Sequence, residues 1–384
     1  MIQAASVQTI IIDDMHLACR DLQEQLEGKL KLLTNSIGIV QTDPEFIEAG
    51  IMGLLYEMLG IPLVGGTTVS IATNGEIGDF MFSLLVLTSD DVEFCPSRTY
   101  GLREDCNSAV KLSMEKYIND RGVPNMVMIF PTVVDELPGD CYVEAVESVC
   151  GDVPIFGSLS VNDSIYDFNR SLSVFNGESF SHDMSYCLFF GDVNPRFFMA
   201  TAPIQSGLTN FDDVVTKASG HIVHEINDMS AAEYFERVGL ASDGVLVDGI
   251  YFVPLLLSAE SGDETRQFVR AIVYFTEDGS AVCRGKIPVG AKIAFGSMSS
   301  DDILASSLET VSKITQEKDI SVALIFSCII RRLSIGPDSM KELAHIKDAF
   351  EGNIPFMASY SGGEISPVGC VNEFNNYSFI ACLL

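Results

Sequence analysis

The sequence predicts an α/β (mixed α+β) protein with two domains, built from repeated β-α-β-β units on mixed parallel and antiparallel sheets. The first observation behind this prediction is the length of 384 residues, which corresponds to two or three domains of about 100–200 residues. The second is the composition: 47% of the residues are hydrophobic and 20% are charged, which suffices for a large core and excludes a disordered chain. The third is a pattern that recurs three times along the chain.

Each copy of this pattern contains an apolar strand, an amphipathic helix, a second strand that begins with Ile-Pro or Val-Pro, a polar turn and a closing strand. The copies place the first strands at 36–40, 125–130 and 321–326, the helices at about 44–59, 141–149 and 338–350, the second strands at 61–65, 153–157 and 354–358, and the closing strands at 80–88, 184–190 and 378–384. Short, continuous apolar runs are typical of strands buried on both faces. A strand–helix–strand unit implies a right-handed parallel crossover, after which the closing strand can return antiparallel.

Local signals support the helices and the division into domains. Asp43 and Pro44 form a favoured N-cap and N1 pair, and Gly60 follows the last expected helical residue as a stop signal. The proline of each second strand belongs at a strand start, where a missing N–H group is tolerated. The segment 193–210 contains two prolines and shifts toward turn residues, so we expect the domains to cover 1–205 and 206–384.

Charge and cysteine content narrow the class of protein. The chain has 23 Lys and Arg against 53 Asp and Glu, a formal net charge of −30 that is spread over both halves. A field of that sign repels phosphate backbones and anionic lipids, which disfavours nucleic-acid and membrane-surface binding. No run approaches the roughly 18 apolar residues of a transmembrane helix, and no basic segment of a signal peptide is present. Because the ten cysteines form no C-x-x-C pair, we expect a reduced, cytoplasmic, soluble protein.

The loops at the carboxyl ends of the parallel strands are the expected ligand-binding region. In a β-α-β unit these ends lie on the same side of the sheet, where α/β proteins form their ligand crevices. In the third copy we therefore expect the residues that follow the two strands to converge. These residues are Ser327, Cys328, Arg331, Tyr360, Gly363 and Glu364.

The first copy offers a second candidate region by the same rule. It brings the turn 65–68 to the loop that carries Gly-Glu-Ile at 75–77. The same tripeptide occurs at 363–365, and we expect both copies at the same topological position. The small residues of the turn could present backbone N–H groups to an anion or could form a tight turn. The candidate residues of this region are Gly66, Thr67 and Glu76.

Arg331, Glu364 and Cys328 each allow a functional and a structural role. Arg331 is a suitable anchor for a ligand carboxylate, because its planar guanidinium binds that group bidentately, but it could instead bind a carbonyl or Glu364. Glu364 could bind a ligand amine, or accept backbone N–H groups and hold its turn. Cys328 could be a thiol activated by Arg331, or a buried cysteine at the end of a core strand.

A series of short motifs covers the chain from about residue 30 to its end. They lie at 64–68, 75–77, 82–87, 155–157, 218–226, 231–232, 269–271, 326–331, 363–365 and 375–378. In this order they resemble the FIST family, with an N-terminal FIST domain followed by a C-terminal one. Ser-Cys-x-x-Arg at 327–331 and Gly-Glu-Ile at 363–365 are the most specific part. The chain departs from the family at Gly362, where an aromatic residue is usual, and at Asn375-Asn376, where a His is usual.

The resemblance implies a sensory, ligand-binding module of signal transduction. Such modules occur in bacteria alone or fused to transmitter domains, and in eukaryotes in F-box proteins, and amino acids or related metabolites are the ligands proposed for them. Because the pattern continues to Leu384, we expect a stand-alone bacterial sensor whose output needs a separate signalling protein. The predicted ligand-binding residues are Ser327, Cys328, Arg331, Tyr360, Gly363, Glu364, Asn376, Gly66, Thr67 and Glu76.

His221 and His224 do not predict a metal site. The resemblance favours a strand for this segment, and residues three apart on a strand face opposite sides of the sheet. No Cys or further His completes a ligand set, so we expect no zinc, no other metal and no cofactor. The sequence also lacks the signatures of Walker and dinucleotide-binding loops and of the hydrolase nucleophile elbow.

Three functions compete on this basis. The favoured one is a cytoplasmic sensor that binds an amino acid or related carboxylate metabolite at the carboxyl ends of the β-α-β strands. The alternatives are a cysteine-dependent enzyme that uses Cys328, and a scaffold for a signalling partner. The sensor is favoured because Arg331 and Glu364 supply a cation and an anion in adjoining loops, while no catalytic set is complete.

Overall fold

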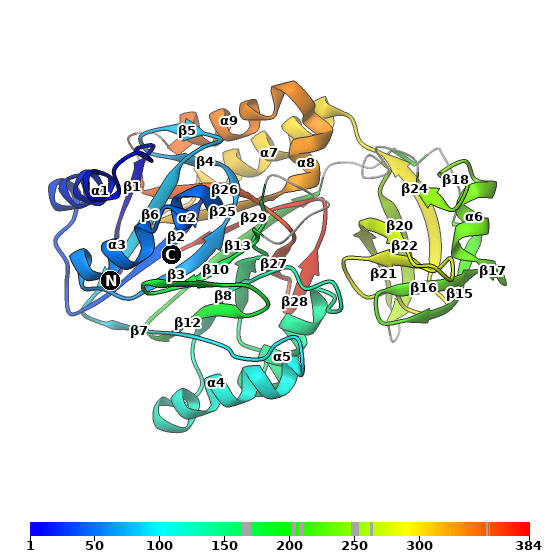
Figure 1. Ribbon diagram of the computed structural model, residues 1–384, viewed down its shortest axis with the longest axis horizontal. Helices are drawn as coiled ribbons and strands as arrows, with labels where there is room; N and C mark the ends of the chain where they lie inside the picture. The colour runs from blue at the N-terminus through cyan, green and yellow to red at the C-terminus, as the bar shows by residue number, and fades with distance from the viewer. Residues whose placement is uncertain are drawn as a thin grey trace.

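The computed structural model has two lobes of unequal size (Figure 1). The larger lobe contains both ends of the chain, and the smaller lobe is formed by the middle of the chain. Most of the smaller lobe lies between β15 (Asp213–Ser219) and β24 (Lys292–Ser297). The structure describes residues 1–162, 170–201, 205–206, 211–246, 253–261, 264–350, 352 and 354–384. Part of the expected boundary segment, 202–204 and 207–210, therefore lies outside the described residues.

The larger lobe contains three six-stranded sheets with the same order of strands: an edge strand, the closing strand, the first strand, the second strand and a two-stranded hairpin. The first sheet is β1 (Gln3–Thr9), β6 (Phe82–Ser89), β2 (Asn35–Thr42), β3 (Leu63–Thr67), β10 (Ser173–Phe175) and β11 (Glu178–Phe180). The second is β7 (Val92–Arg98), β12 (Met184–Gly191), β8 (Met126–Pro131), β9 (Ile155–Ser158), β27 (Glu364–Val368) and β28 (Val371–Asn375). The third is β13 (Arg196–Thr201), β29 (Ser378–Leu383), β25 (Ala323–Cys328), β26 (Phe356–Ser361), β4 (Val69–Thr73) and β5 (Ile77–Gly78).

In each of these sheets the first and second strands are parallel and the closing strand is antiparallel, as the repeat predicts. β2 pairs in parallel with β3, β8 with β9 and β25 with β26. β6, β12 and β29 return antiparallel to the first strands. Each second strand begins just after its proline, and the carbonyl oxygens of Pro62, Pro154 and Pro355 accept hydrogen bonds of 2.9, 2.9 and 3.0 Å from the first strands. The α/β fold on mixed sheets is therefore confirmed.

The hairpins are exchanged among the three units in a closed cycle. β4 follows β3 in the chain but pairs with β26 of the third sheet, β27 follows β26 but pairs with β9 of the second, and β10 follows β9 but pairs with β3 of the first. The N-terminal and C-terminal parts of the chain are thereby joined in one lobe.

The structure corrects the expectation that the two Gly-Glu-Ile tripeptides occupy the same topological position. The segment 363–365 opens β27, whereas 75–77 leads from β4 into β5, so their topological positions differ.

Helices cover the outer faces of the three sheets, and the inner faces share one core. The first sheet carries α1 (Met15–Lys29), α2 (Pro44–Glu48) and α3 (Ile51–Leu59), the second α4 (Cys106–Arg121) and α5 (Asp140–Cys150), and the third α7 (Ser300–Ile314), α8 (Ile329–Ile335), the short 3-10 helix η2 (Gly336–Asp338) and α9 (Met340–Phe350). In the shared core, Ile39 of the first sheet, Met128 of the second and Phe326 of the third belong to one apolar cluster. Phe326 stacks on Phe156 with ring centroids 5.4 Å apart.

The helix expected at 44–59 is two helices. Asp43 caps the first and accepts a hydrogen bond of 2.9 Å from the N–H group of Glu45, and Gly60 ends the second with a φ of 63°. Both terminal signals are therefore confirmed. Between the helices Gly50 has a φ of 88°, which residues with a Cβ rarely adopt, and the helix is interrupted there.

The smaller lobe is an insertion between β13 and α7, inside the third unit. Its nine-stranded sheet contains β14 (Gln205–Ser206), β15, β16 (Ile222–Ile226), β17 (Met229–Ser230), β20 (Leu255–Ser261), β21 (Glu264–Arg270), β22 (Ile272–Phe275), β23 (Ala281–Cys283) and β24, beside α6 (Ala231–Arg237) and the hairpin β18 (Ala241–Ser242) and β19 (Val245–Leu246). After β24 the chain returns to the larger lobe (Figure 1). The division into 1–205 and 206–384 stays a prediction about sequence domains, and its boundary falls at the entry into this insertion.

Candidate functional site

The predicted residues of the third unit meet at the carboxyl ends of β25 and β26. The parallel register places Ser327 opposite Tyr360, and Cys328 opposite Ser361. α8 begins directly after Cys328 and carries Arg331, and Glu364 opens β27. All of these side chains are buried, so the convergence takes place in the interior of the larger lobe rather than in an open crevice.

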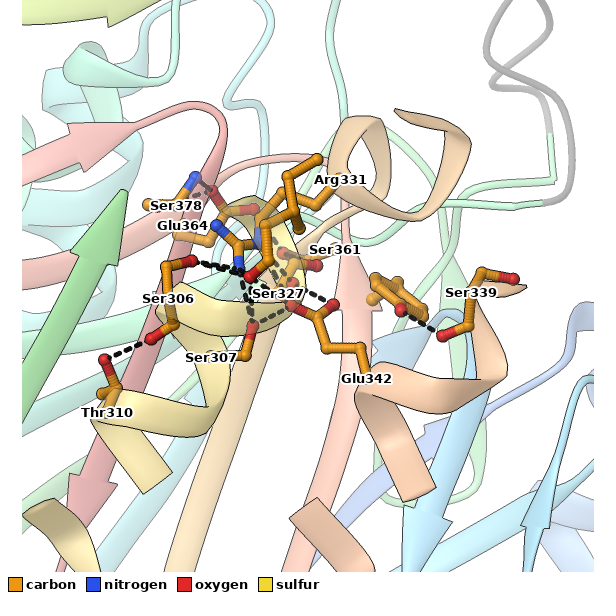
Figure 2. Close-up of polar contacts among 12 residues, drawn as sticks. Ser306, Ser307, Thr310, Ser327, Arg331, Ser339, Glu342, Ser361, Glu364 and Ser378 are labelled. Atoms are coloured by element: carbon orange, nitrogen blue, oxygen red, sulfur yellow. Dashed lines mark hydrogen bonds and ion pairs between the residues drawn. The ribbon is translucent and has the colours of Figure 1, made fainter. Parts of the chain in front are cut away.

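Arg331 is enclosed by partners from three other elements (Figure 2). Its Nη2 donates to Oε1 of Glu342 on α9 at 2.9 Å and to Oγ of Ser307 on α7 at 2.7 Å. Its Nε donates to Oγ of Ser327 on β25 at 3.2 Å, and the carbonyl oxygen of Ile303 accepts from Nη2 at 3.1 Å. Of the structural alternatives for Arg331, the carbonyl partner is observed, and its acidic partner is Glu342.

The Arg331–Glu342 pair is fully buried, since neither side chain has any solvent exposure. Removal of one member of such a pair costs about 3–5 kcal/mol, because the other charge is left uncompensated. A ligand carboxylate would therefore have to displace Glu342 to reach the guanidinium. Within the described residues Nη1 of Arg331 is buried without a hydrogen-bond partner. This geometry favours a structural role, in which the pair holds α7, α8 and α9 against the third sheet.

Glu364 is held by two serines. Its Oε1 accepts from Oγ of Ser361 at 2.6 Å, and its Oε2 accepts from Oγ and N–H of Ser378 at 2.7 and 3.3 Å. Burial raises the pKa of Glu364 to about 8, although these hydrogen bonds and the charge of Arg331 act in the opposite direction. Glu364 is therefore mostly protonated at neutral pH, and its contacts fit the structural alternative.

Cys328 lies at the end of β25 with 1% of its surface exposed. Burial raises the pKa of its thiol well above the ordinary value, and the neighbouring Glu364 acts in the same direction more strongly than Arg331 opposes it. A reactive cysteine needs a depressed pKa and access to solvent. The surroundings of Cys328 fit a buried core cysteine.

Gly66 and Thr67 pack between the first and second units. A Cβ on Gly66 would lie 2.1 Å from Oγ of Ser160 and 2.9 Å from the carbonyl oxygen of Leu172, so a side chain at this position would require its neighbours to move. Oγ1 of Thr67 accepts a hydrogen bond of 2.9 Å from the N–H group of Leu172. The segment expected to be a turn is therefore mostly strand, because Gly65, Gly66 and Thr67 are the last residues of β3 and pair with β2. The tight-turn alternative is corrected, and the small residues instead allow the close packing of this strand.

The three other predicted residues lie in different surroundings. Glu76 is exposed in the turn between β4 and β5, away from the buried cluster. The carbonyl oxygen of Gly363 accepts from Leu159 at 2.9 Å within the larger lobe. Oδ1 of Asn376 accepts a hydrogen bond of 3.3 Å from the N–H group of Ala271 in the smaller lobe. Of the predicted set, Asn376 is thus placed where the two lobes meet.

The two histidines lie in or beside a strand, as expected. Nδ1 of His224 on β16 lies 2.9 Å from Oγ of Ser280, and Nε2 of His221 lies 3.2 Å from the carbonyl oxygen of Asp135. Burial lowers the pKa of His221. In the described part of the chain, no group of three His, Cys, Asp or Glu residues could hold a metal ion.

A cavity of about 360 Å³, here called the interlobe cavity, lies between the two lobes. Its walls come from α5 and β28 in the larger lobe and from β20, β21 and the segment after β23 in the smaller lobe. The cationic residues in the wall are Arg266, Arg270 and Lys286, the acidic ones are Asp140, Glu144, Glu147, Glu260 and Glu373, and the aromatic ones are Phe268 and Phe374. The volume lies within the range of small-molecule sites, and the charged lining suits a polar, charged ligand.

Arg270 fastens the smaller lobe to α5 beside this cavity. Its Nη2 donates to Oδ1 of Asp140 at 3.0 Å, and its Nη1 donates to the carbonyl oxygen of Phe374 at 3.3 Å. Oδ2 of the same aspartate accepts from the N–H group of Lys286 at 2.7 Å. The guanidinium lies 4.8 Å from the ring centroid of Phe268. Arg270 is therefore already satisfied and shapes the wall of the interlobe cavity.

Arg266 and Lys286 are more accessible than Arg270. Arg266 pairs with Glu373, and Lys286 pairs with Glu144. The side chains of the two cations are 42% and 37% exposed, against 7% for Arg270. The pair of Lys286 and Glu144 is exposed on both sides and therefore weak, so Lys286 can exchange this carboxylate for a ligand carboxylate at small cost. Arg266 is equally accessible, although its partner Glu373 is 15% exposed.

This cavity was not predicted from the sequence, although one of its residues, Arg270, lies in the motif Val269-Arg270-Ala271. The acidic side chains of 140–147 are spaced like an ordinary solvated helix face. The cationic partners of Asp140 and Glu144 follow them in the chain by 130 and 142 residues. Because no local pattern connects these segments, only the docking of the two lobes reveals the site.

Two family models match the chain: the FIST N domain over residues 36–229 and the FIST C domain over residues 231–367. The matches cover well over half of the chain, and the protein therefore belongs to the FIST family, with both domains in tandem. This confirms the resemblance noted in the sequence. FIST domains are associated with signal transduction and small-ligand sensing.

The boundary between the two matched domains falls inside the smaller lobe, close to β17. The FIST N and FIST C segments therefore do not correspond to the two lobes. A search of curated proteins gave no significant match. None of the helices in the described part of the chain has the length and apolar character that a membrane span requires.

Proposed function

We propose that this protein is a sensor that binds an amino acid or a related carboxylate metabolite in the interlobe cavity. The interlobe cavity is the observation that carries the proposal, because it joins a suitable volume to both cationic and acidic groups. A zwitterionic ligand needs both signs of charge within a few ångströms of each other. The association of FIST domains with small-ligand sensing supports the same class of function.

The accessible cations supply the carboxylate site in this proposal. Lys286 and Arg266 can turn from Glu144 and Glu373 toward a ligand carboxylate, and the released glutamates can then accept its ammonium group. The ion pair of Arg270 and Asp140 holds β21 of the smaller lobe against α5 of the larger lobe. The ligand would therefore contact both lobes at once.

Contact with both lobes provides a route from binding to signal. A ligand that bridges α5 and β21 favours the arrangement of lobes to which it binds best, and a partner protein can distinguish that arrangement. We therefore propose that a separate signalling protein receives the output. We place this function in the cytoplasm, which is supported by ten cysteines that are all free.

We propose a binding protein rather than a cysteine-dependent enzyme. The burial of Cys328 and the raised pKa of its thiol support this choice. The same burial supports moving the proposed ligand site from Arg331 and Glu364 to the interlobe cavity.

A thermal-shift screen against amino acids and organic acids, followed by titration calorimetry, tests the proposal. A ligand at 100 times its Kd should stabilise the protein by about 2.7 kcal/mol, a rise of a few degrees in Tm. Lys286→Ala should weaken binding. Lys313→Ala is the matched control. Lys313 is an exposed lysine that pairs with one glutamate, Glu309, and neither residue lines the cavity. A screen without any hit, or equal effects of both variants, would refute the proposed site.

A further inference from the structure

We infer that the ligand of the interlobe cavity carries a net positive charge, as an amino acid with a second amino group or a guanidinium does. This inference rests on the proposed function and narrows its ligand class. It starts from the charges of the wall, where five carboxylates stand against three cations.

Each of the three cations already has a carboxylate partner. The pairs are Arg270 with Asp140, Arg266 with Glu373, and Lys286 with Glu144. These pairs cancel three of the negative charges. Glu147 and Glu260 remain, and within the described residues neither of them forms an ion pair. The wall therefore has an excess of two negative charges.

The hydrogen bonds observed at these two carboxylates come from neutral groups. Oε1 of Glu147 accepts from Nδ2 of Asn372 at 3.0 Å, and Oε1 of Glu260 accepts from Oγ1 of Thr265 at 3.3 Å. A neutral donor orients a carboxylate but leaves its charge in place. In a partly enclosed cavity the lower effective dielectric strengthens the attraction of that charge for a cation.

The aromatic residues of the wall add to this preference. Phe268 and Phe374 both line the cavity, and each already attracts the guanidinium of Arg270, at 4.8 and 5.9 Å from the ring centroids. The negative face of an aromatic ring favours a cationic group over an anionic one. The net charge of −30 on the whole chain also draws cations toward the molecule.

An acidic metabolite fits the same cavity poorly. It could reach Lys286 or Arg266 only by displacing Glu144 or Glu373, and it would then add its own negative charges to a wall that already has an excess. A basic amino acid makes the same exchange with its carboxylate but brings two cationic groups. One can meet the displaced glutamate, and the other can meet Glu147 or Glu260.

The test compares L-arginine, L-lysine, L-leucine and L-glutamate by titration calorimetry on the full chain, at low and at physiological ionic strength. We expect arginine and lysine to bind and leucine and glutamate to bind at least tenfold more weakly. Affinity for the basic amino acids should fall as salt is added. Glu147→Gln should weaken arginine and lysine about tenfold, because the glutamine keeps the oxygen that accepts from Asn372 but loses the charge.

Glu309→Gln provides the matched control, since Glu309 is an exposed helical glutamate of α7, and it should leave the affinities unchanged. Suppose that glutamate or leucine binds as tightly as arginine and that this binding is lost in Lys286→Ala. That result would overturn the inference that the ligand is cationic, while the proposed function would stand. Unchanged arginine affinity in both Glu147→Gln and Glu260→Gln would overturn it as well. Absence of binding by all four amino acids, and by every compound of the screen above, would contradict both proposals together.

Discussion

Nη2 of Arg331 lies 2.9 Å from Oε1 of Glu342, and both side chains are completely withdrawn from solvent. The pair connects α8 to α9, and Ser307 of α7 donates a further hydrogen bond to the same carboxylate oxygen. Arg331, which the sequence suggested as an anchor for a ligand carboxylate, therefore holds three helices together. Its charge is used inside the fold.

Glu342→Gln should destabilise the protein by about 3–5 kcal/mol, because it leaves the guanidinium of Arg331 buried without a counter-charge. The double variant Arg331→Met, Glu342→Leu should recover most of that loss, since apolar side chains of similar volume need no partner. Urea unfolding measures both values. The exposed pair of Glu309 and Lys313 is the control, and its removal should cost at most about 0.5 kcal/mol. A loss of that size for Glu342→Gln would contradict the structural role.

The repeats of the larger lobe could be predicted from sequence because each one is local. The parallel strands, their prolines and the cap at Asp43 follow from apolar runs and neighbouring residues. The exchange of β4, β10 and β27 could not, because a strand's own sequence does not specify which sheet edge accepts it. The insertion of the smaller lobe between β13 and α7 was not predicted either, because the strands there do not specify in their own sequence that they form a separate sheet.

Glu364 should make the stability of the protein fall as the pH rises from about 4.5 to about 8. Its native pKa is raised to about 8 from an ordinary value of 4.5, so in this range the folded protein keeps a proton that the unfolded chain has released. Unfolding then releases a proton, and a higher pH favours it. The stabilisation is complete below pH 4.5 and is lost as the pH passes through the native value.

Glu364→Gln isolates this effect, because glutamine resembles the protonated carboxyl group and can keep the contacts with Ser361 and Ser378. Urea midpoints of both proteins are measured at intervals between pH 5 and pH 8.5. We expect the difference between them to shift steadily in favour of the variant as the pH rises. Parallel curves would mean that Glu364 titrates normally in the folded protein.

Cys328 should resist alkylation in the folded protein. Cys370 is exposed, and Cys141 is partly exposed, so iodoacetamide at pH 7.5 should label Cys370 first. Cys328 should react only after unfolding, because burial both blocks access and raises the pKa of its thiol. Mass spectrometry of peptides from a labelling time course gives the order. Labelling of Cys328 as fast as that of Cys370 would revive the enzymatic alternative.

The partner of Arg331 is a part of the candidate site that could not be predicted from the sequence. The rule that strand ends converge placed Ser327, Arg331 and Tyr360 together, but it could not reveal that Glu342 would occupy the guanidinium. Glu342 belongs to a helix whose apolar stripe is visible in sequence, while its own burial is not. Burial of an ion pair depends on how α7 packs over α9, and that packing is a tertiary property.

Gly65→Ala should destabilise the larger lobe, because the backbone at this position leaves no room for a side chain. Gly65 has a φ of 145° and pairs with Val40 across β2 and β3, and a Cβ there would lie 1.9 Å from the carbonyl oxygen of Val40. The strands would have to separate, at a cost of about 1–3 kcal/mol or more. Gly28→Ala in the last turn of α1 is the control, since its Cβ would meet nothing within 4 Å and should add about 0.5–1 kcal/mol of stability. Thermal unfolding of both variants tests this prediction. We expect a lowered Tm for Gly65→Ala and an unchanged or raised Tm for Gly28→Ala. Equal shifts of Tm in the two variants would contradict the close approach of β2 and β3.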